Sequence, residues 1–137
     1  MSEPVIQSLV ARRIWDSRGR PTVEAEIRLS DGAMGRGIAP AGASRGSREA
    51  IDKRDGGQGF RKFDVQDALQ GIRAEIAPAV VGLDPFDQAA LDAKLIALDD
   101  TPNKARLGGN ALTAVSLAAL HAAAAPTQDG EPTSRIL

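Results

Sequence analysis

The stretch Thr22-Val23-Glu24-Ala25-Glu26-Ile27-Arg28-Leu29 decides the fold class of this 137-residue chain. Apolar and polar residues alternate along its whole length, so all the apolar side chains fall on one side of an extended backbone. A period of two predicts a β-strand with one face in the core and the other face in water.

The segments on either side of this strand predict two more strands. Residues 5–15 are rich in branched and aromatic side chains, and residues 16–21 form a polar turn signal that contains glycine and proline. After the strand, Asp31-Gly32 favours a tight hairpin that returns the chain through residues 33–39. We therefore expect an antiparallel meander of three strands.

From Ser47 onward the apolar period becomes helical. One stripe at helical spacing follows Asp64, a candidate cap, and Pro78 is expected to kink or end its helix. The members of this stripe are Val65, Ala68, Leu69, Ile72 and Ile76. Asp84-Pro85 predicts the start of the next helix, because it places a cap residue before a proline at the first helical position.

Residues 111–125 are apolar on nearly every side of a helix, which predicts that neighbouring elements cover it. The run is also too short to cross a bilayer. Strands first and helices afterwards, without βαβ alternation, predict an α+β fold in which a helical layer follows the meander. We expect one domain over residues 1–125 and a linker over residues 126–137.

Composition limits the possible partners. The chain has 17 basic and 18 acidic side chains, a formal net charge of −1, so no positive field would gather nucleic acid or a membrane surface. It has no cysteine and no visible signal peptide, which leads us to expect a cytoplasmic protein.

The loop Gly42-Ala43-Ser44-Arg45-Gly46 follows an apolar strand and precedes a predicted helix start. Its glycines allow the backbone to pass close to a ligand, and only Ser44 and Arg45 carry groups that could bind one. The loop also fits the G-x-S-x-G pattern of a hydrolase nucleophile. A serine nucleophile needs a base, and His121, the only histidine, lies among alanines, so a glycine-rich surface turn is the simpler interpretation.

Three further positions have a structural interpretation that we favour over a functional one. We expect His121 to be a helix residue with a satisfied ring rather than a ligand or a base. Asp99-Asp100 fits a solvated helix terminus better than a paired-carboxylate site. Trp15 is expected in the core or at a dimer contact.

Several separated motifs resemble the amino-terminal domain of enolase, the phosphopyruvate hydratase of glycolysis. They occur in the family's order, and the resemblance runs from about residue 5 to residue 125. The motifs are Asp16-Ser17-Arg18-Gly19-Arg20-Pro21-Thr22-Val23-Glu24, the loop around Ser44, Arg54-Asp55-Gly56, and Asn103-Lys104-Ala105-Arg106-Leu107-Gly108-Gly109-Asn110-Ala111 followed by Val115-Ser116-Leu117.

The resemblance implies a lyase that dehydrates 2-phosphoglycerate to phosphoenolpyruvate with Mg²⁺. In the family the lysine base and the carboxylates of the first magnesium site belong to a following barrel, which takes about 250 residues. We therefore expect no catalytic residue in these 137 residues and no activity from them alone. Residues 126–137 would be a linker or the truncated start of the barrel.

By the same resemblance, the domain supplies a lid and part of a dimer interface. Ser44 matches the loop serine that reaches the second magnesium ion when the lid closes over the substrate. The rest of the lid loop is Ala41, Gly42, Ala43, Arg45 and Gly46. Arg12 and Glu24 match positions that form ion pairs across the dimer interface, which implies a homo-oligomer.

Arg45 departs most from the family pattern, because it stands where enolases have threonine. A long cation there would change the closing geometry of the lid and the field near a phosphate. The alternative, which predicts the same fold, is a non-enzymatic protein-binding module that retains the enolase amino-terminal fold and uses its former barrel-facing surface to bind another protein.

Overall fold

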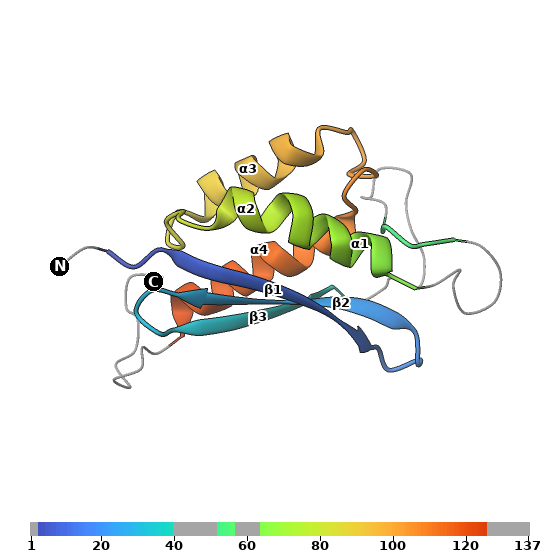
Figure 1. Ribbon diagram of the computed structural model, residues 1–137, viewed down its shortest axis with the longest axis horizontal. Helices are drawn as coiled ribbons and strands as arrows, with labels where there is room; N and C mark the ends of the chain where they lie inside the picture. Colours follow the sequence, from blue (N-terminus) through green and yellow to red (C-terminus); the bar gives the residue numbers. More distant parts are fainter. Residues whose placement is uncertain (1–2, 40–51, 57–63, 126–137) are drawn as a thin grey trace.

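The computed structural model describes residues 3–39, 52–56 and 64–125. These residues form an α+β domain in which three antiparallel strands lie on one side and the helices on the other (Figure 1). The strands are β1 (Ile6–Trp15), β2 (Pro21–Leu29) and β3 (Met34–Ala39), in the sheet order β1-β2-β3. The predicted fold class and meander are confirmed.

Both predicted turns form, and aspartates hold them. In the β1–β2 turn the Asp16 carboxylate accepts hydrogen bonds from the backbone N–H groups of Arg18 and Arg20, both at 2.9 Å. In the β2–β3 turn the Asp31 carboxylate accepts from the N–H of Ala33, and Gly32 takes a positive φ of 92°. That φ is open to glycine and strained for most other residues, which explains the Asp-Gly pair.

The helices follow the sheet in the chain. The first helical run consists of α1 (Gln66–Gly71), a π-helical turn η2 (Ile72–Ile76) and α2 (Ala77–Val80). It is followed by α3 (Gln88–Asp99) and α4 (Gly109–Ala124). The first run packs on β1, α4 packs on β2 and β3, and α3 packs on α4 and α2. The predicted central position of the alanine-rich helix is confirmed, because ten residues of α4 are buried.

Two glycines of β3 allow α4 to approach the sheet. A Cβ atom built on Gly35 would lie 2.0 Å from the backbone nitrogen of Ala122, and one built on Gly37 would lie 2.1 Å from the carbonyl oxygen of Ala114. Both distances are far below a van der Waals contact, so the helix backbone occupies the space of the missing side chains. Most of the helix atoms at this contact are backbone atoms, and the fully buried Ala118 contributes to both contacts.

The first helix is capped differently from the prediction. Asp64 is not its N-cap, because Val65 holds that position and makes no side-chain cap. Instead the Asp55 carboxylate accepts hydrogen bonds from the N–H groups of Gln66, at 3.3 Å, and Asp67, at 2.8 Å. A cap supplied from eleven residues upstream satisfies the same orphan donors that a local cap would.

Two other helix boundaries correct the sequence analysis. The first helical run passes through Pro78 and ends at Val80. The π-helical turn directly before α2 changes the hydrogen-bond spacing where the proline cannot donate. The next helix begins at Gln88 rather than at Pro85, because Asp87 is the residue whose side chain accepts from the N–H of Ala90.

The sequence analysis placed Asp99 at a solvated helix terminus. In the structure Asp99 is fully buried. Its carboxylate accepts hydrogen bonds from the N–H and the hydroxyl of Thr101 and, at 2.7 Å, from the N–H of Leu107. Burial raises the pKa of Asp99, but these hydrogen bonds outweigh burial and hold the pKa below its ordinary value. The buried carboxylate thus organises the loop between α3 and α4.

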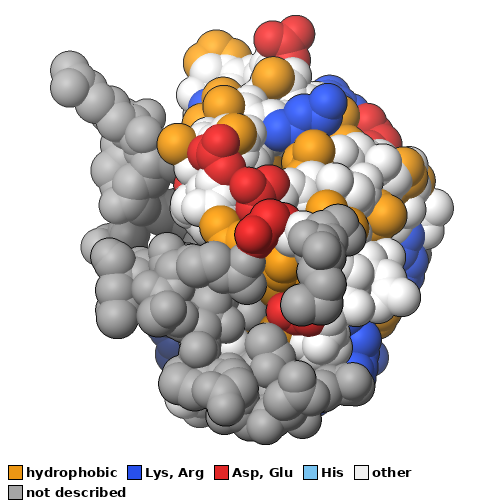
Figure 2. All heavy atoms as spheres, turned by 90° about the vertical axis from the view of Figure 1, so that its left-hand side faces the viewer, with side chains coloured by type: hydrophobic (Ala, Val, Ile, Leu, Met, Phe, Trp, Pro, Cys, Tyr) orange, Lys and Arg blue, Asp and Glu red, His pale blue; other side chains and the backbone are white. Residues whose placement is uncertain are grey.

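The helix start predicted after Ser47 and the linker predicted over residues 126–137 lie outside the described residues. Within the described ranges, no helix is long and apolar enough to cross a membrane. At the end of the molecule seen in Figure 2, hydrophobic side chains lie interspersed with acidic ones.

Replacing Gly37 by alanine tests the contact between α4 and β3. We expect Gly37→Ala to lower the free energy of unfolding by about 3 kcal/mol or more, because the added methyl meets backbone atoms that cannot move aside. The matched control is Gly71→Ala, whose methyl would meet only the end of the Leu107 side chain at 3.3 Å. That variant should be within about 1 kcal/mol of the wild type, or more stable. Urea unfolding measures both, and equal losses would contradict the close-contact explanation.

Candidate functional site

The predicted lid residues, Ala41 to Gly46, lie outside the described residues, but both flanks of the segment 40–51 are described. On the β3 side, the Thr22 hydroxyl donates to the carbonyl oxygen of Ala39. On the other side, a guanidinium nitrogen of Arg54 donates to the carbonyl oxygen of Pro21 at 2.9 Å. Two consecutive residues of β2 therefore hold the two flanks: Thr22 binds the flank before residue 40, and Pro21 binds the flank after residue 51.

Asn110 at the start of α4 fixes the second flank more firmly. Its side-chain oxygen accepts from the N–H of Lys53 at 2.8 Å, and its side-chain nitrogen donates to the carbonyl oxygen of Lys53 at 3.0 Å. Gly108 makes room for this contact, since a Cβ there would lie 2.4 Å from the Cβ of Lys53. Its φ of 103° also favours glycine.

The other site prediction, Arg12 and Glu24, falls on the face of the sheet opposite the helices. We call this the open face, and it consists of Val10, Arg12, Glu24, Glu26, Arg28, Arg36 and Ile38. Arg12 and Glu24 are direct cross-strand partners, and their side chains form an ion pair of 2.6 Å within the chain. The structure therefore brings the two predicted residues together, and whether they contact a second subunit remains a prediction.

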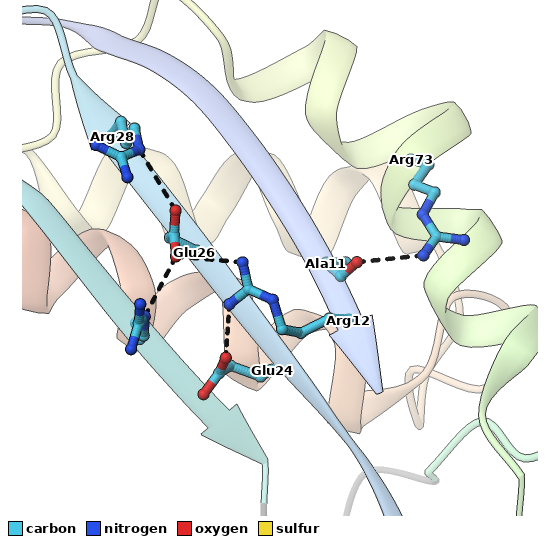
Figure 3. Close-up of polar contacts among 7 residues, drawn as sticks. Ala11, Arg12, Glu24, Glu26, Arg28 and Arg73 are labelled. Atoms are coloured by element: carbon cyan, nitrogen blue, oxygen red, sulfur yellow. Dashed lines mark hydrogen bonds and ion pairs between the residues drawn. The ribbon is translucent and has the colours of Figure 1, made fainter. Parts of the chain in front are cut away.

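Glu26 lies at the centre of the open face, as Figure 3 shows, between side chains from neighbouring strands. Its carboxylate contacts Arg12 and Arg36, both at 3.2 Å, and Arg28 at 3.4 Å. The register explains the cluster, because Arg36 is directly opposite Glu26 and Arg28 lies two residues further along β2 on the same face. One carboxylate thus holds guanidinium groups from all three strands.

This environment shifts the pKa values of Glu26 and Arg12. Burial raises the pKa of Glu26, but hydrogen bonds and charges from its arginines outweigh burial and leave the pKa below its ordinary value. The hydrogen bond to Glu24 raises the pKa of Arg12. Both shifts favour the charged forms of Glu26 and Arg12.

Glu26 was missed in the sequence analysis, which placed this side of β2 in water. The residue is only 7% exposed, because the long side chains of its arginine neighbours cover it. The signal that could have found it is an acidic residue in the central strand with arginines at the paired positions of both neighbouring strands.

Trp15 is not in the core, since 52% of the residue is exposed. The guanidinium of Arg13 stacks over its ring at 5.1 Å and also pairs with Asp64 at 3.1 Å. His121 is an exposed residue of α4 whose ring contacts the carbonyl oxygen of Arg36, so the expected satisfied ring is confirmed.

Among residues 3–39, 52–56 and 64–125, no group of three or more histidine, aspartate, glutamate or cysteine side chains could hold a metal ion.

The geometry defines a class of protein: an α+β domain with anchored loop flanks at one end and an ionic sheet face on which none of the described helices packs. The sequence matches the family described as "Enolase, N-terminal domain" over residues 6–130. A curated protein named "Enolase" from Acidothermus cellulolyticus is 51% identical over 120 residues, which cover 88% of this chain. The chain belongs to the enolase N-terminal domain family.

The aligned region covers only 28% of that relative, so the chain spans little more than a quarter of the relative's length. The predicted family membership is confirmed.

Substituting Glu26 tests its role as a buried counter-ion. Because its pKa is lowered in the folded state, its ionised form stabilises the protein above the ordinary glutamate pKa of about 4.3. This contribution is lost as pH falls through the lower, folded-state pKa. We expect Glu26→Gln to be less stable than the wild type at pH 7, and the difference to shrink below about pH 4.3.

Chemical unfolding of both proteins between pH 7 and pH 3 measures this difference. Glu75→Gln is the control, because Glu75 forms an exposed pair with Arg106, and its loss should cost no more than about 1 kcal/mol. A difference between Glu26→Gln and the wild type that stays constant down to pH 3 would contradict the assignment.

Proposed function

We propose that this chain supplies the lid and dimer contacts of an enolase, which dehydrates 2-phosphoglycerate to phosphoenolpyruvate with magnesium in glycolysis. One observation carries the proposal: 88% of the chain aligns with little more than a quarter of a protein named enolase. The remaining length of such a protein would provide the catalytic barrel. A cytoplasmic homo-oligomer is part of the same proposal.

The anchored flanks support the lid role. A lid must move while its ends stay in place, and here Thr22 and Asn110 hold the residues on its two sides. Under the proposal, Ser44 contacts the second magnesium ion, and Ala41, Gly42, Ala43, Arg45 and Gly46 form the rest of the lid. Magnesium would act as a Lewis acid on the substrate, with its carboxylate ligands coming from the barrel.

The open face supports the dimer role. Arg12 and Glu24 lie on a sheet face that the helices leave uncovered, where a second subunit can reach them. Because Arg12 and Glu24 are already paired with each other, a partner would add contacts to a pair whose geometry is fixed.

The proposal is tested with the 137-residue chain alone and with the same chain joined in frame to the barrel portion of the A. cellulolyticus enolase. We expect no phosphoenolpyruvate from the chain alone, because under the proposal the acid–base groups and the magnesium carboxylates belong to the barrel. The joined protein should form phosphoenolpyruvate in a magnesium-dependent reaction. Activity of the contaminant-free chain alone would refute the proposal, and an inactive but folded joined protein would favour the non-enzymatic binding module.

Ser44→Ala separates a metal role from a structural one. In the chain alone it should change the free energy of unfolding by no more than about 0.5 kcal/mol, as for an ordinary surface substitution. In the joined protein it should lower turnover substantially and raise the magnesium concentration needed for activity. Strong destabilisation of the chain alone would instead identify Ser44 as a structural residue.

A further inference from the structure

A groove lies between α3 and α4, which are antiparallel neighbours. Gln88, the first residue of α3, donates to the hydroxyl of Ser116 in the middle of α4 at 2.9 Å. Asp99, the last residue of α3, accepts from the N–H of Leu107 just before α4 begins. Figure 1 shows α3 on the side of the helical layer away from the sheet. The groove is therefore on the helical side of the domain and is separate from the open face.

The groove contains a cavity of about 290 Å³ with an aliphatic floor. Leu95 and Leu112 are the buried part of its lining, whereas Ile96 at the rim is 52% exposed. Ile96 is the most exposed of the large aliphatic residues that the structure describes. A partner that covers this surface would remove apolar area from water, which favours association.

A carboxylate and an ammonium group lie at opposite ends of the groove. Asp92 accepts from the hydroxyl of Ser116 at 2.6 Å, while Lys104 lines the end at which α4 begins, near Gly109. Ser116 and Gly109 are two turns apart on α4, which is about 10 Å along the helix axis. Ile96 lies between the two charged ends, because it is one turn beyond Asp92 on the same face of α3.

Both charged groups can accept a further partner. The hydrogen bonds that Asp92 receives from Ser116 and Gln88 use its Oδ1, and within the described ranges none uses its Oδ2. The Nζ of Lys104 lies 3.4 Å from the carbonyl oxygens of Thr101 and Pro102, and it forms no ion pair with a residue that the structure describes. An ion pair with a partner would therefore displace none of the short hydrogen bonds in the groove.

The order of charges makes the groove complementary to itself. A two-fold axis through its middle would place Asp92 of each copy against Lys104 of the partner subunit, and Ile96 against Ile96 of the partner subunit. A two-fold interface joins the same patch on both subunits, so a groove with one sign of charge at both ends would repel its copy. The groove between α3 and α4 has opposite signs at its ends and thus attracts it.

We propose that the chain pairs with a second copy of itself through the groove between α3 and α4, with reciprocal ion pairs between Asp92 and Lys104 and with Ile96 at the centre. The two helices from each copy would pack as a four-helix bundle. The aliphatic centre would supply most of the affinity, and the ion pairs would fix the relative orientation of the copies. This contact goes beyond the proposed function, whose dimer contacts lie on the open face.

Sedimentation velocity of the 137-residue chain over a wide concentration range measures this association. The main variant is Ile96→Glu, which changes an exposed side chain and so leaves the fold intact. The matched controls are Val81→Glu, just after α2, and Ile38→Glu, on the open face, where the original residues are 45% and 42% exposed. We expect a wild-type dimer, a dissociation constant at least about tenfold higher for Ile96→Glu, and no increase for either control. Thermal unfolding of every variant checks that it is folded.

A double-mutant cycle with Asp92→Asn and Lys104→Gln tests the reciprocal ion pairs. Asparagine keeps an oxygen for Ser116 and Gln88 but carries no charge, so the contacts within the chain are retained. If Asp92 of one copy meets Lys104 of the other, each single variant should raise the dissociation constant at least about threefold, and the double variant should raise it no further than either single one.

Three results would overturn the inference. They are a wild type that is monomeric at every concentration, an Ile96→Glu variant that associates like Val81→Glu, and increases in the cycle that add up as for independent sites. Association that is lost in Ile38→Glu but kept in Ile96→Glu would also overturn it, in favour of the open face.

Discussion

The contact between α4 and the two glycines of β3 is the constraint on which the rest of this domain depends. With Gly35 and Gly37 opposite Ala114, Ala118 and Ala122, the helix backbone lies directly against the strand. Dispersion forces fall steeply with distance, so a closer approach gives every atom at the contact more favourable neighbours. The alanines contribute little hydrophobic area each, and close packing compensates for their size.

Because of this contact, the two faces of the sheet have different roles: one packs against helices and the other does not. The inner face is covered by α4 and by the first helical run, and Arg73 ties that run to the edge of the sheet by donating to the carbonyl oxygen of Ala11 at 3.2 Å (Figure 3). The outer face carries charged side chains, with the exposed Val10 and Ile38 among them. Asn110, in the first turn of α4, extends the same helix to the flank of the predicted lid. A single helix thus connects the core with both regions that the proposed function uses.

The elements that the sequence predicted well are those whose signals are local. Alternation along β2, the Asp-Gly turn and the apolar run of α4 each depend on neighbouring residues, and each is present in the structure. The errors concern partners that are distant in the chain. Asp55 caps α1 from eleven and twelve residues away, and the burial of Glu26 depends on arginines of two other strands. No local pattern reports such contacts, because the polar groups are satisfied only after the elements have packed.

The candidate site follows the same rule. Arg12 and Glu24 could be paired from the strand register, whereas the roles of Asn110 and Arg54 become visible only when the segment 52–56 is seen against α4 and β2. Resemblance to enolases identified the motifs that contain these residues, but it did not assign them a contact. The structure adds the physical reason for their presence on either side of the lid segment.

Native-state hydrogen exchange of the 137-residue chain tests most directly whether the α4 contact supports the whole fold. If it does, backbone amides in the middle of α4 and in the central strand β2 should exchange with the same free energy, equal to that of global unfolding. Amides of α4 that exchange with a clearly lower free energy, while those of β2 remain protected, would show that the sheet persists without the helix and would contradict this account.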